Sequence, residues 1–424
     1  MGTTRSFQDM LNEYLPNELL KEELIMRDYI LQNVQKDNNW KGGNLVVPFK
    51  GAGASSVRFG QLTASNDISQ SKHVRGNIAD YREVWSSLIF NQRDLQEHDG
   101  KIPETTFLRL LPDELEDLMD YKKEVVSIQL GSGPQFATIQ DNSGIGGAAA
   151  PTAGGLMPVD KIDRFQINQK LVLDDNDSAA LTVYVIAVNV NTKTVTVSAT
   201  RGGAVVDISA YSVAQAAKCY HDGVFDAGGN HETFVSMRQA LLSATNGGTA
   251  NIHGQLKTAY PILQSVNIDG SAMTAATILN DLFNAYTEAR ERGKGLASEY
   301  LMSLKNFGSV MKQLELQKGS YRVVEEPKES LYGWMEMKIA NVTGRITKIV
   351  GIQEMDDDII PLVDWRSITF RSNGYFKKRI SPDGREYFEI RAESGYQYIV
   401  DCCLFGEMEY KKPGHSAIIH GISY

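Results

Sequence analysis

The hydrophobic positions at the start of the chain follow the period of a helix. They recur at helical spacing, at Leu20, Leu24, Leu31 and Val34, although Arg27 interrupts the stripe. A polar run at 36–39 follows them. The pattern predicts a helical N-terminal arm over 1–43, with helix to about residue 35.

The apolar positions become sparse over 44–82. Residues 45–49 read as a short strand, residues 51–56 are small, and the return near 73–78 has few large apolar groups. We predict a long extended β-hairpin here. A two-stranded hairpin is marginal in water on its own, so it needs a neighbour, either this subunit or another. A disordered loop is the alternative interpretation.

An amphipathic pattern over 103–130 gives the clearest helix signal. Its apolar face holds Leu111, Leu115, Leu118, Met119, Val125 and Val126. Pro112 suits a first helical turn, and Pro103 is compatible with a shorter leading helix. Gly131 and Gly133 end the pattern. We therefore predict a long, rigid helix.

A linker rich in glycine and alanine leads into a separate all-β domain, and the two together span 144–229. Two valine pairs mirror each other about a polar loop: Val188 with Val197, and Val190 with Val195. We predict a hairpin in which these pairs face each other. The upstream valines have the opposite parity, so we expect a bulge near 186–187.

The stretch 230–336 alternates helix and strand patterns. A helical pattern near 278–289 ends at Gly293, and a short buried strand at 299–302 runs directly into a second helix. The tail, 337–424, is rich in strand patterns, with Asn-Gly and Asp-Gly turn signals.

Composition and charge disfavour several classes of protein. The chain of 424 residues has 43 Lys and Arg against 52 Asp and Glu, a net charge of −9. Nucleic-acid binding needs clustered cations that neutralise phosphates, so this balance disfavours a general nucleic-acid binder. The 3 cysteines give no disulfide framework, and we expect synthesis in a reducing cytoplasm. No apolar run has the length of a membrane span, so we expect no membrane contact.

No catalytic motif is complete in the sequence. His231-Glu232 lacks the second histidine of a metalloprotease helix, and Gly293-Lys294-Gly295 lacks the Ser or Thr of a phosphate-binding loop. Asp356, Asp357 and Asp358 have the chemistry of a hard-cation site without the spacing of a calcium loop, so we expect a solvated turn. We predict no catalytic residue, no metal site and no cofactor.

Several segments resemble the major capsid proteins of tailed bacteriophages. The segment EYLMSLKNF at 299–307 is similar to a buried strand of that family that ends in methionine and is followed at once by a helix. Residues 316–322 resemble the turn after that helix, and residues 331–334 resemble the next strand entry. The runs at 401–406 and 417–421 are similar to late strands of phage coats. The order of the predicted elements also matches the family.

This resemblance implies the Hong Kong 97-type capsid fold. That fold is α+β, with an N-terminal arm, an extended β-hairpin loop, a long spine helix and a central α/β domain, to which this chain adds an inserted small all-β domain. The implied parts are an arm at 1–43, an extended loop at 44–82, a peripheral domain at 83–143 and 337–424, a linker with the inserted domain at 144–229, and an axial domain at 230–336.

The resemblance also implies a structural protein and not an enzyme. Its copies would assemble into hexamers and pentamers of an icosahedral virion shell that encloses double-stranded phage DNA without sequence-specific binding. Scaffold, portal and decoration proteins are possible further partners. Two other interpretations stay open: an encapsulin-like nanocompartment shell, and a protein that binds a ligand through its β domain.

The extended loop is the expected place of contact between subunits. Within it we expect Phe49, Arg58, Phe59 and Arg75 to touch a neighbour, because exposed aromatic and arginine side chains are enriched at interfaces. The arm is expected to pack beneath an adjacent subunit.

Overall fold

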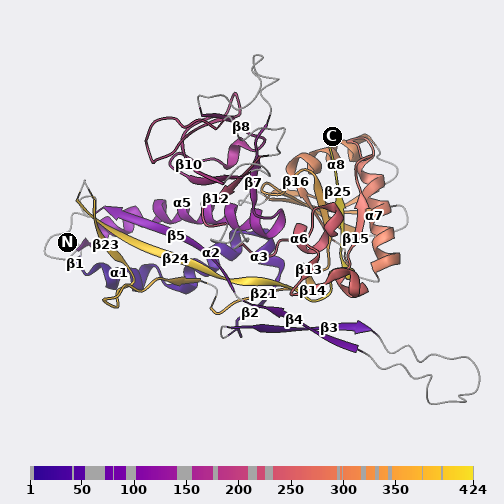
Figure 1. Ribbon diagram of the computed structural model, residues 1–424, viewed down its shortest axis with the longest axis horizontal. Coiled ribbons are helices and arrows are strands. Elements are labelled where there is room, and N and C mark those ends of the chain that lie inside the picture. The colour runs from indigo at the N-terminus through magenta and orange to yellow at the C-terminus, as the bar shows by residue number, and fades with distance from the viewer. Residues whose placement is uncertain are drawn as a thin grey trace, which may run out of the picture. The chain divides into compact units, whose positions relative to one another are not determined.

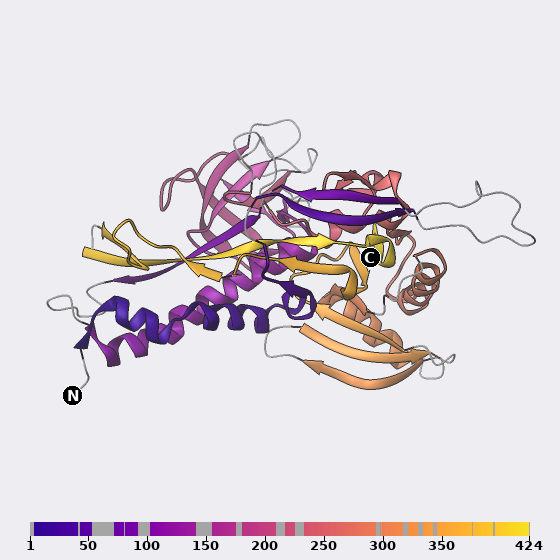
Figure 2. The same ribbon diagram turned by 90° about the horizontal axis from the view of Figure 1, so that it is seen from below.

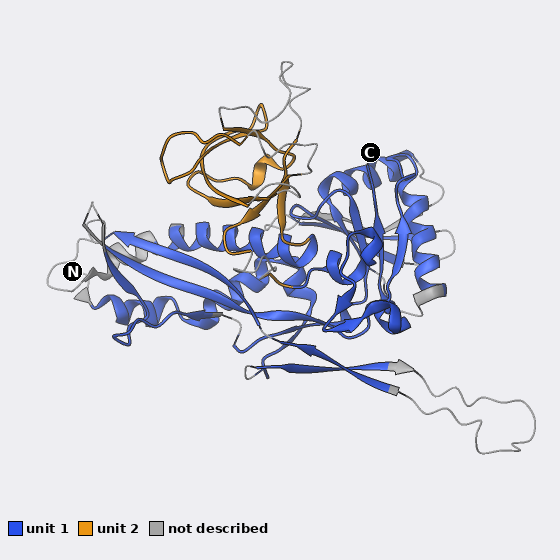
Figure 3. Ribbon diagram, viewed as in Figure 1, with its two compact units in different colours: residues 1–132, 235–424 blue, residues 133–234 orange. Residues whose placement is uncertain are grey.

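The computed structural model describes most of the chain. The described residues are 4–40, 43–52, 72–79, 81–91, 102–140, 155–174, 180–208, 217–224, 233–293, 297, 299–316, 321–329, 334–341, 346–374, 376–392 and 395–423. The chain forms two compact units: unit 1 is Met1–Ser132 with Val235–Tyr424, and unit 2 is Gly133–Phe234 (Figure 3). Mixed helices and strands confirm the α+β class, and the predicted kinds of element follow in the expected order.

Three short helices form the N-terminal arm: α1 (Phe7–Tyr14), α2 (Asn17–Arg27) and α3 (Tyr29–Asn33). Phe7 is buried and stacks on Tyr398, with ring centroids 4.7 Å apart. The Tyr29 hydroxyl donates to the buried carboxylate of Glu299 at 2.5 Å. The described part of the arm therefore packs on its own chain, and its contact with an adjacent subunit stays a prediction.

The long helix α5 spans Glu104–Gly131, and Pro112 lies inside it. The long helix predicted over 103–130 is confirmed, while the placing of Pro112 in a first helical turn and the separate leading helix were wrong. A proline inside a helix removes one backbone hydrogen bond and costs about 3 kcal/mol. Burial of the apolar face opposes this cost, since Leu118, Met119 and Val126 are all buried.

The long strand β24 (Gly395–Tyr410) organises one sheet of unit 1. Its antiparallel partners are β5 (Arg82–Asn91), β21 (Ile368–Arg371), β22 (Phe376–Lys378) and β23 (Phe388–Ala392), and β2 (Gln35–Asp37) runs parallel to β21. Figures 1 and 2 show β24 and β5 side by side along α5. Leu88 and Val400 are buried on one face, while Trp85 and Ile89 are exposed on the other.

The second large sheet of unit 1 has seven strands. In spatial order they are β15 (Val266–Asp269), β25 (Ala417–His420), β20 (Ile359–Val363), β16 (Glu299–Ser303), β19 (Ile346–Ile352), β18 (Trp334–Asn341) and β17 (Tyr321–Glu329). Helices α7 (Ile278–Gly293) and α8 (Leu304–Leu316) share a core with this sheet around Tyr300, Phe307 and Ile349. The predicted helix, buried strand and second helix are confirmed. Strands β19, β20 and β25 show that the sheet also uses residues beyond 336.

Unit 2 is a six-stranded antiparallel sheet. Its spatial order is β7 (Gln135–Thr138), β12 (Lys218–His221), β9 (Lys170–Asp174), β10 (Leu181–Asn189), β11 (Thr194–Ser198) and β8 (Leu156–Pro158). A bridge between Ile139 and Val159, next to β7 and β8, joins the two ends into a closed barrel. Because β7 belongs to this barrel, the unit begins before the linker that the sequence indicated.

The β10–β11 hairpin has a different register from the expected one. Val185 pairs with Val197 and Val188 pairs with Val195, with the predicted bulge between Val185 and Ala187. The expected pairing of Val190 was wrong, because that residue lies in the turn and is 68% exposed. The bulge and the shifted register together place Val183, Val185, Val195 and Val197 in the core of the barrel.

Unit 1 has further strands and one further α-helix among the described residues. They are β1 (Thr4–Arg5), paired with β6 (Ile102–Pro103), the hairpin of β13 (Asn251–Ile252) and β14 (Gln255–Leu256), helix α6 (Met237–Leu241), and the hairpin of β3 (Leu45–Ala52) and β4 (Lys72–Ile78).

Gly406 marks the point where β24 leaves β5 and begins to pair with β21. A Cβ at this position would overlap the Phe370 ring and lie 2.8 Å from the Arg371 carbonyl oxygen. We predict that Gly406→Ala lowers the free energy of unfolding by about 1–3 kcal/mol through overpacking. Gly308→Ala is the control, because a Cβ there meets no atom within 4 Å and α8 favours alanine. Urea denaturation measures both, and equal stability of the two variants would contradict this reading of β24.

Candidate inter-subunit site at the hairpin stem

The hairpin stem, β3 with β4, has two unlike faces. Its inward face carries Leu45, Val47, Phe49, Val74, Gly76 and Ile78, and its outward face carries Val46, Pro48, Lys50, His73, Arg75 and Asn77. Strand geometry produces this separation, because successive side chains point to opposite faces. Phe49 and Val47 are buried, while every residue of the outward face is exposed.

Hydrogen bonds fix one edge of the stem to the rest of unit 1. The Asn77 N–H donates to the His253 carbonyl at 2.8 Å, and the Arg75 carbonyl accepts from Gln255 Nε2 at 2.8 Å. The backbone groups of Asn77 and Arg75 therefore point away from β3. By the antiparallel pattern, their partners Val46 and Pro48 also turn their backbone groups outward. Proline has no N–H, so Pro48 blunts the free edge of β3 against pairing with a further strand.

His253 is the centre of this attachment. Its ring lies 6.1 Å from that of Phe49 and 6.5 Å from that of Tyr410, stacked on both. Its Nε2 accepts the Tyr410 N–H at 3.0 Å. His253 and Gly254 form the two-residue turn of the β13–β14 hairpin, each with a positive φ, as a type I′ turn requires. A non-glycine residue in that conformation is uncommon, and here it presents the ring to the stem.

Gly76 lies opposite Val47 on the inward face, at the same point of the stem. A Cβ there would overlap the Phe49 ring and lie 3.1 Å from the His253 carbonyl oxygen. Glycine is therefore the residue that allows the stem to approach His253 so closely.

A second buried group lies beside this attachment. Glu407 Oε1 accepts the N–H groups of Val235 and Met408 at 2.8 Å each. Burial raises the pKa of the Glu407 carboxyl to about 7. The Tyr410 hydroxyl donates to the Val235 carbonyl at 3.2 Å. Together with the contacts of Asn77 and Arg75, these polar contacts join the stem to the β13–β14 turn and to the end of β24.

Four residues were predicted to contact a neighbouring subunit, and the structure places two of them. Phe49 is 1% exposed, against His253 of its own chain, and Arg75 is exposed on the outward face. Arg58 and Phe59 lie outside the described residues. Contact between subunits stays a prediction for all four. His253 and Gln255 were missed; Gly254 is a weak turn signal, but nothing in the sequence indicates that these residues meet the stem.

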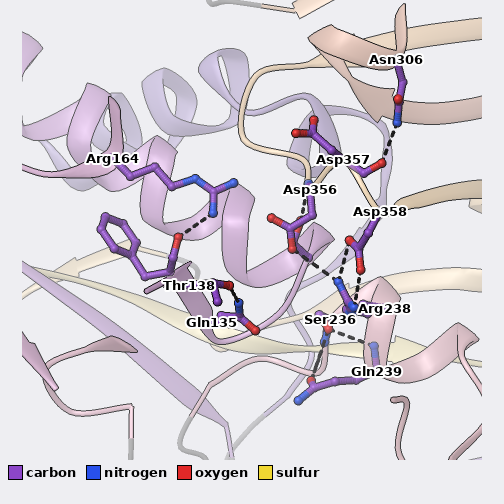
Figure 4. A network of polar contacts seen from close by, with 12 residues as sticks. Gln135, Thr138, Arg164, Ser236, Arg238, Gln239, Asn306, Asp356, Asp357 and Asp358 are labelled. Atoms are coloured by element: carbon purple, nitrogen blue, oxygen red, sulfur yellow. Dashed lines mark hydrogen bonds and ion pairs between the residues drawn. The ribbon is translucent and has the colours of Figure 1, made fainter. Parts of the chain in front are cut away.

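Asp357 and Asp358 lie in a turn, as expected, but the three aspartates at 356–358 are only partly exposed, and Figure 4 shows Arg238 and Asn306 beside them. Arg238 from α6 donates to both carboxylate oxygens of Asp358, at 2.9 and 2.6 Å, and lies 3.5 Å from Asp356. Asn306 from α8 donates to the Asp357 carbonyl at 2.9 Å. This segment therefore ties α6 and α8 together, a role that was not predicted because sequence spacing does not reveal a distant arginine.

The described residues offer little further chemistry. Among them, no group of three or more His, Cys, Asp and Glu side chains is placed to hold a metal ion. Cys219, Cys402 and Cys403 are free and buried, and burial raises their thiol pKa values, to about 11 at Cys402. No helix in the described part of the chain is long and apolar enough to cross a membrane.

Comparison with known proteins gives structural similarities only. No protein-family model matches the chain, and no curated protein matches it. The chain is similar to the capsid asymmetric unit of cyanophage A-1(L), with 11% identity, 97% of this chain and 96% of that chain covered, and a TM-score of 0.45. It is also similar to the capsid of Myoviridae phage XM1, with 8% identity, 93% of this chain and 91% of that chain covered, and a TM-score of 0.37. A third similar structure is the SrpI encapsulin of Synechococcus elongatus, with 6% identity, 93% of this chain and 87% of that chain covered, and a TM-score of 0.35.

The buried His253 ring makes the stem's attachment sensitive to acid. Burial lowers its pKa from 6.5 to about 4. As the pH falls below 6.5, the unfolded chain takes up the proton first, so stability is full above 6.5 and declines toward pH 4. We predict that the advantage of the wild type over His253→Gln shrinks by about 3 kcal/mol across this window.

Thermal or urea unfolding of both proteins at several pH values measures this difference. Glu407 and other titrating groups are present in both and cancel in the comparison. A constant difference between pH 7 and pH 4 would contradict the assigned role of the ring.

Proposed function

We propose that this protein is the coat subunit of a bacteriophage shell, built by association of many copies. The hairpin stem carries the proposal. It is paired with no other described strand, it is seated on its own chain along one face and one edge, and it leaves a whole face with Lys50 and Arg75 exposed. A two-stranded ribbon gains stability when a further surface covers it, and a second copy of the chain offers that surface.

Assembly follows from repetition of this contact. Each subunit would lay its hairpin across the next, so that one heterologous contact repeats around a ring. Individual contacts between exposed groups are weak, and closure of a ring and then of a shell makes each further contact intramolecular. Pentamers are the rings that close an icosahedral shell, and larger shells add hexamers between them. The net charge of −9 suits a wall that encloses DNA without binding it tightly.

The rest of unit 1 would serve as a rigid plate for this contact. Helix α5 and the β24 sheet share a buried face, and the arm is fixed to the same body by Phe7 and Tyr29. Such a plate transmits the orientation of one hairpin contact to the next. Scaffold, portal and decoration proteins would be added partners of the assembled shell, in a virion made in a bacterial cytoplasm.

Shortening the hairpin tests this proposal. We predict that replacing residues 53–71 by a short Gly-Ser turn leaves a folded subunit and abolishes closed particles, because the stem keeps its own attachment and loses its reach. Negative-stain microscopy counts particles, and circular dichroism with size-exclusion chromatography reports the folded subunit. Normal shells from the shortened variant would refute the role of the hairpin. Particles that hold a cargo protein in place of nuclease-resistant DNA would favour the encapsulin-like interpretation.

A further inference from the structure

A buried aspartate, Asp28, stands at the junction of α2 and α3 in the arm. Its N–H donates to the Leu24 carbonyl at 3.1 Å at the end of α2, and its Oδ1 accepts the Leu31 N–H at 2.6 Å at the start of α3. The residue is 0% exposed. One residue therefore caps both helices, and it does so with a carboxyl group that water does not reach.

The second oxygen of this carboxyl lacks such a partner. Asp28 Oδ2 is buried and forms no hydrogen bond with any residue that the structure describes. Ser127 of α5 faces the same carboxyl, and its buried hydroxyl also has no hydrogen-bond partner in the described part of the chain. Burying a charged oxygen without a partner is costly, so this geometry disfavours the carboxylate. A protonated carboxyl is neutral and has an O–H that can donate to a hydroxyl.

The charged groups around Asp28 leave its carboxyl without an ion pair. Lys123 of α5 lies in the same cluster, but its ammonium binds Glu354 Oε1 at 2.5 Å, and both side chains are buried. Lys36 of β2 is exposed, and its ammonium donates to the Gln32 carbonyl at 3.2 Å. Among the described residues, no cation lies within ion-pair distance of the Asp28 carboxyl. Two carboxyl groups thus lie beside one buried ammonium.

This environment favours the protonated form of Asp28. Burial raises the pKa of its carboxyl from 3.8 to about 6; the Glu354 charge adds to the increase, while the Leu31 N–H and the Lys123 ammonium oppose it. If α2 and α3 separate from α5, the carboxyl reaches water and its pKa returns toward the ordinary value. The closed arm therefore binds the proton more tightly than the open arm. Its attachment is strongest in acid and weakens as the pH rises from about 4 to about 6.

We propose that Asp28 is a proton-operated lock between the arm and α5. The protonated carboxyl holds the junction of α2 and α3 against Ser127, and loss of the proton favours separation of these helices from α5. Figure 2 shows the helices of the arm beside α5, so the junction lies where the two meet. The lock belongs to the single subunit and does not depend on the proposed shell function. Acid has the opposite effect at the stem, where protonation of His253 weakens the attachment.

Hydrogen exchange of the full-length free subunit, followed from about pH 4 to about pH 7, tests the lock. The amides of Leu31, Gln32 and Val34 are hydrogen-bonded at α3 and report its opening. Their exchange is divided by that of an unstructured peptide at each pH. The opening is then expected to increase by up to about tenfold per pH unit until the pH reaches about 6, and to level off above it.

Asp28→Asn is the main variant, because asparagine keeps an oxygen that can accept the Leu31 N–H and cannot ionise. We expect its α3 to open less than that of the wild type at neutral pH, on the order of a hundredfold, and to show no pH dependence in this window. A purely structural role for Asp28 gives the opposite result, since the substitution would then loosen α3 at every pH.

Two further variants test the cluster. Glu354→Gln removes the charge that adds to the raised pKa, so the midpoint of the pH profile is expected to move to lower pH. Asp117→Asn is the matched control, since it makes the same change at an exposed aspartate of α5, and it is expected to keep the wild-type profile. Circular dichroism and thermal melting show that each variant is folded.

The outcomes are decisive in either direction. A pH-independent opening of wild-type α3, an Asp28→Asn variant that opens as readily as the wild type at neutral pH, or an unchanged midpoint in Glu354→Gln would overturn the lock. The wild-type profile and the Glu354→Gln shift decide the question even if Asp28→Asn does not fold. Because every measurement uses the free subunit, a failure to form particles would count against the proposed function and not against the lock.

Discussion

A two-stranded hairpin has too little apolar surface to hold itself in place, and this constraint shapes the rest of the molecule. The rest of unit 1 supports the stem along one face and one edge. Phe49 and Val47 bury the inward face, and the Asn77 N–H and Arg75 carbonyl fix one edge through His253 and Gln255. Among the described residues, none gives the outward face such support. The structure thus holds the hairpin ready at its base and leaves its outer surface for another molecule.

The attachment is firm because it ends on β24, the strand of unit 1 that pairs with the most other described strands. His253 accepts a hydrogen bond from Tyr410, the last residue of β24. That strand pairs in turn with four others and shares a buried face with α5. A force on the hairpin would therefore reach the body through β24. Glu407 and Tyr410 bind the segment at Val235 to the same strand end.

Local patterns predicted much of the fold because each of the predicted elements is dominated by its own periodicity. The helix α7, the buried strand β16 and the bulge at Ile186 are examples. The errors arose where distant residues decide. The burial of its apolar face allows α5 to run through Pro112, and Arg238, more than a hundred residues away, turns an acidic run into an anchored segment. The register at Val190 changed because the bulge shifts which valines face the core.

The candidate site was only partly predictable for the same reason. The sequence indicated a hairpin in need of a neighbour, and the residues 44–82 were the correct place to look. It gave no signal for a histidine at 253 that meets both Phe49 and Tyr410, since those contacts cross most of the chain. From the sequence, both Phe49 and Arg75 were expected to contact a neighbour. Because side chains alternate along a strand, Phe49 points inward and Arg75 points outward.

Hydrogen exchange, compared between free subunits and purified particles, tests the central claim most directly. We predict that amides on the outward edge of β3, at Val46 and Lys50, exchange rapidly in the free subunit and are protected in particles. The Asn77 amide, already bonded to His253, should be protected in both states. Equal exchange at Val46 and Lys50 in subunits and particles would contradict the claim that a second copy covers the stem.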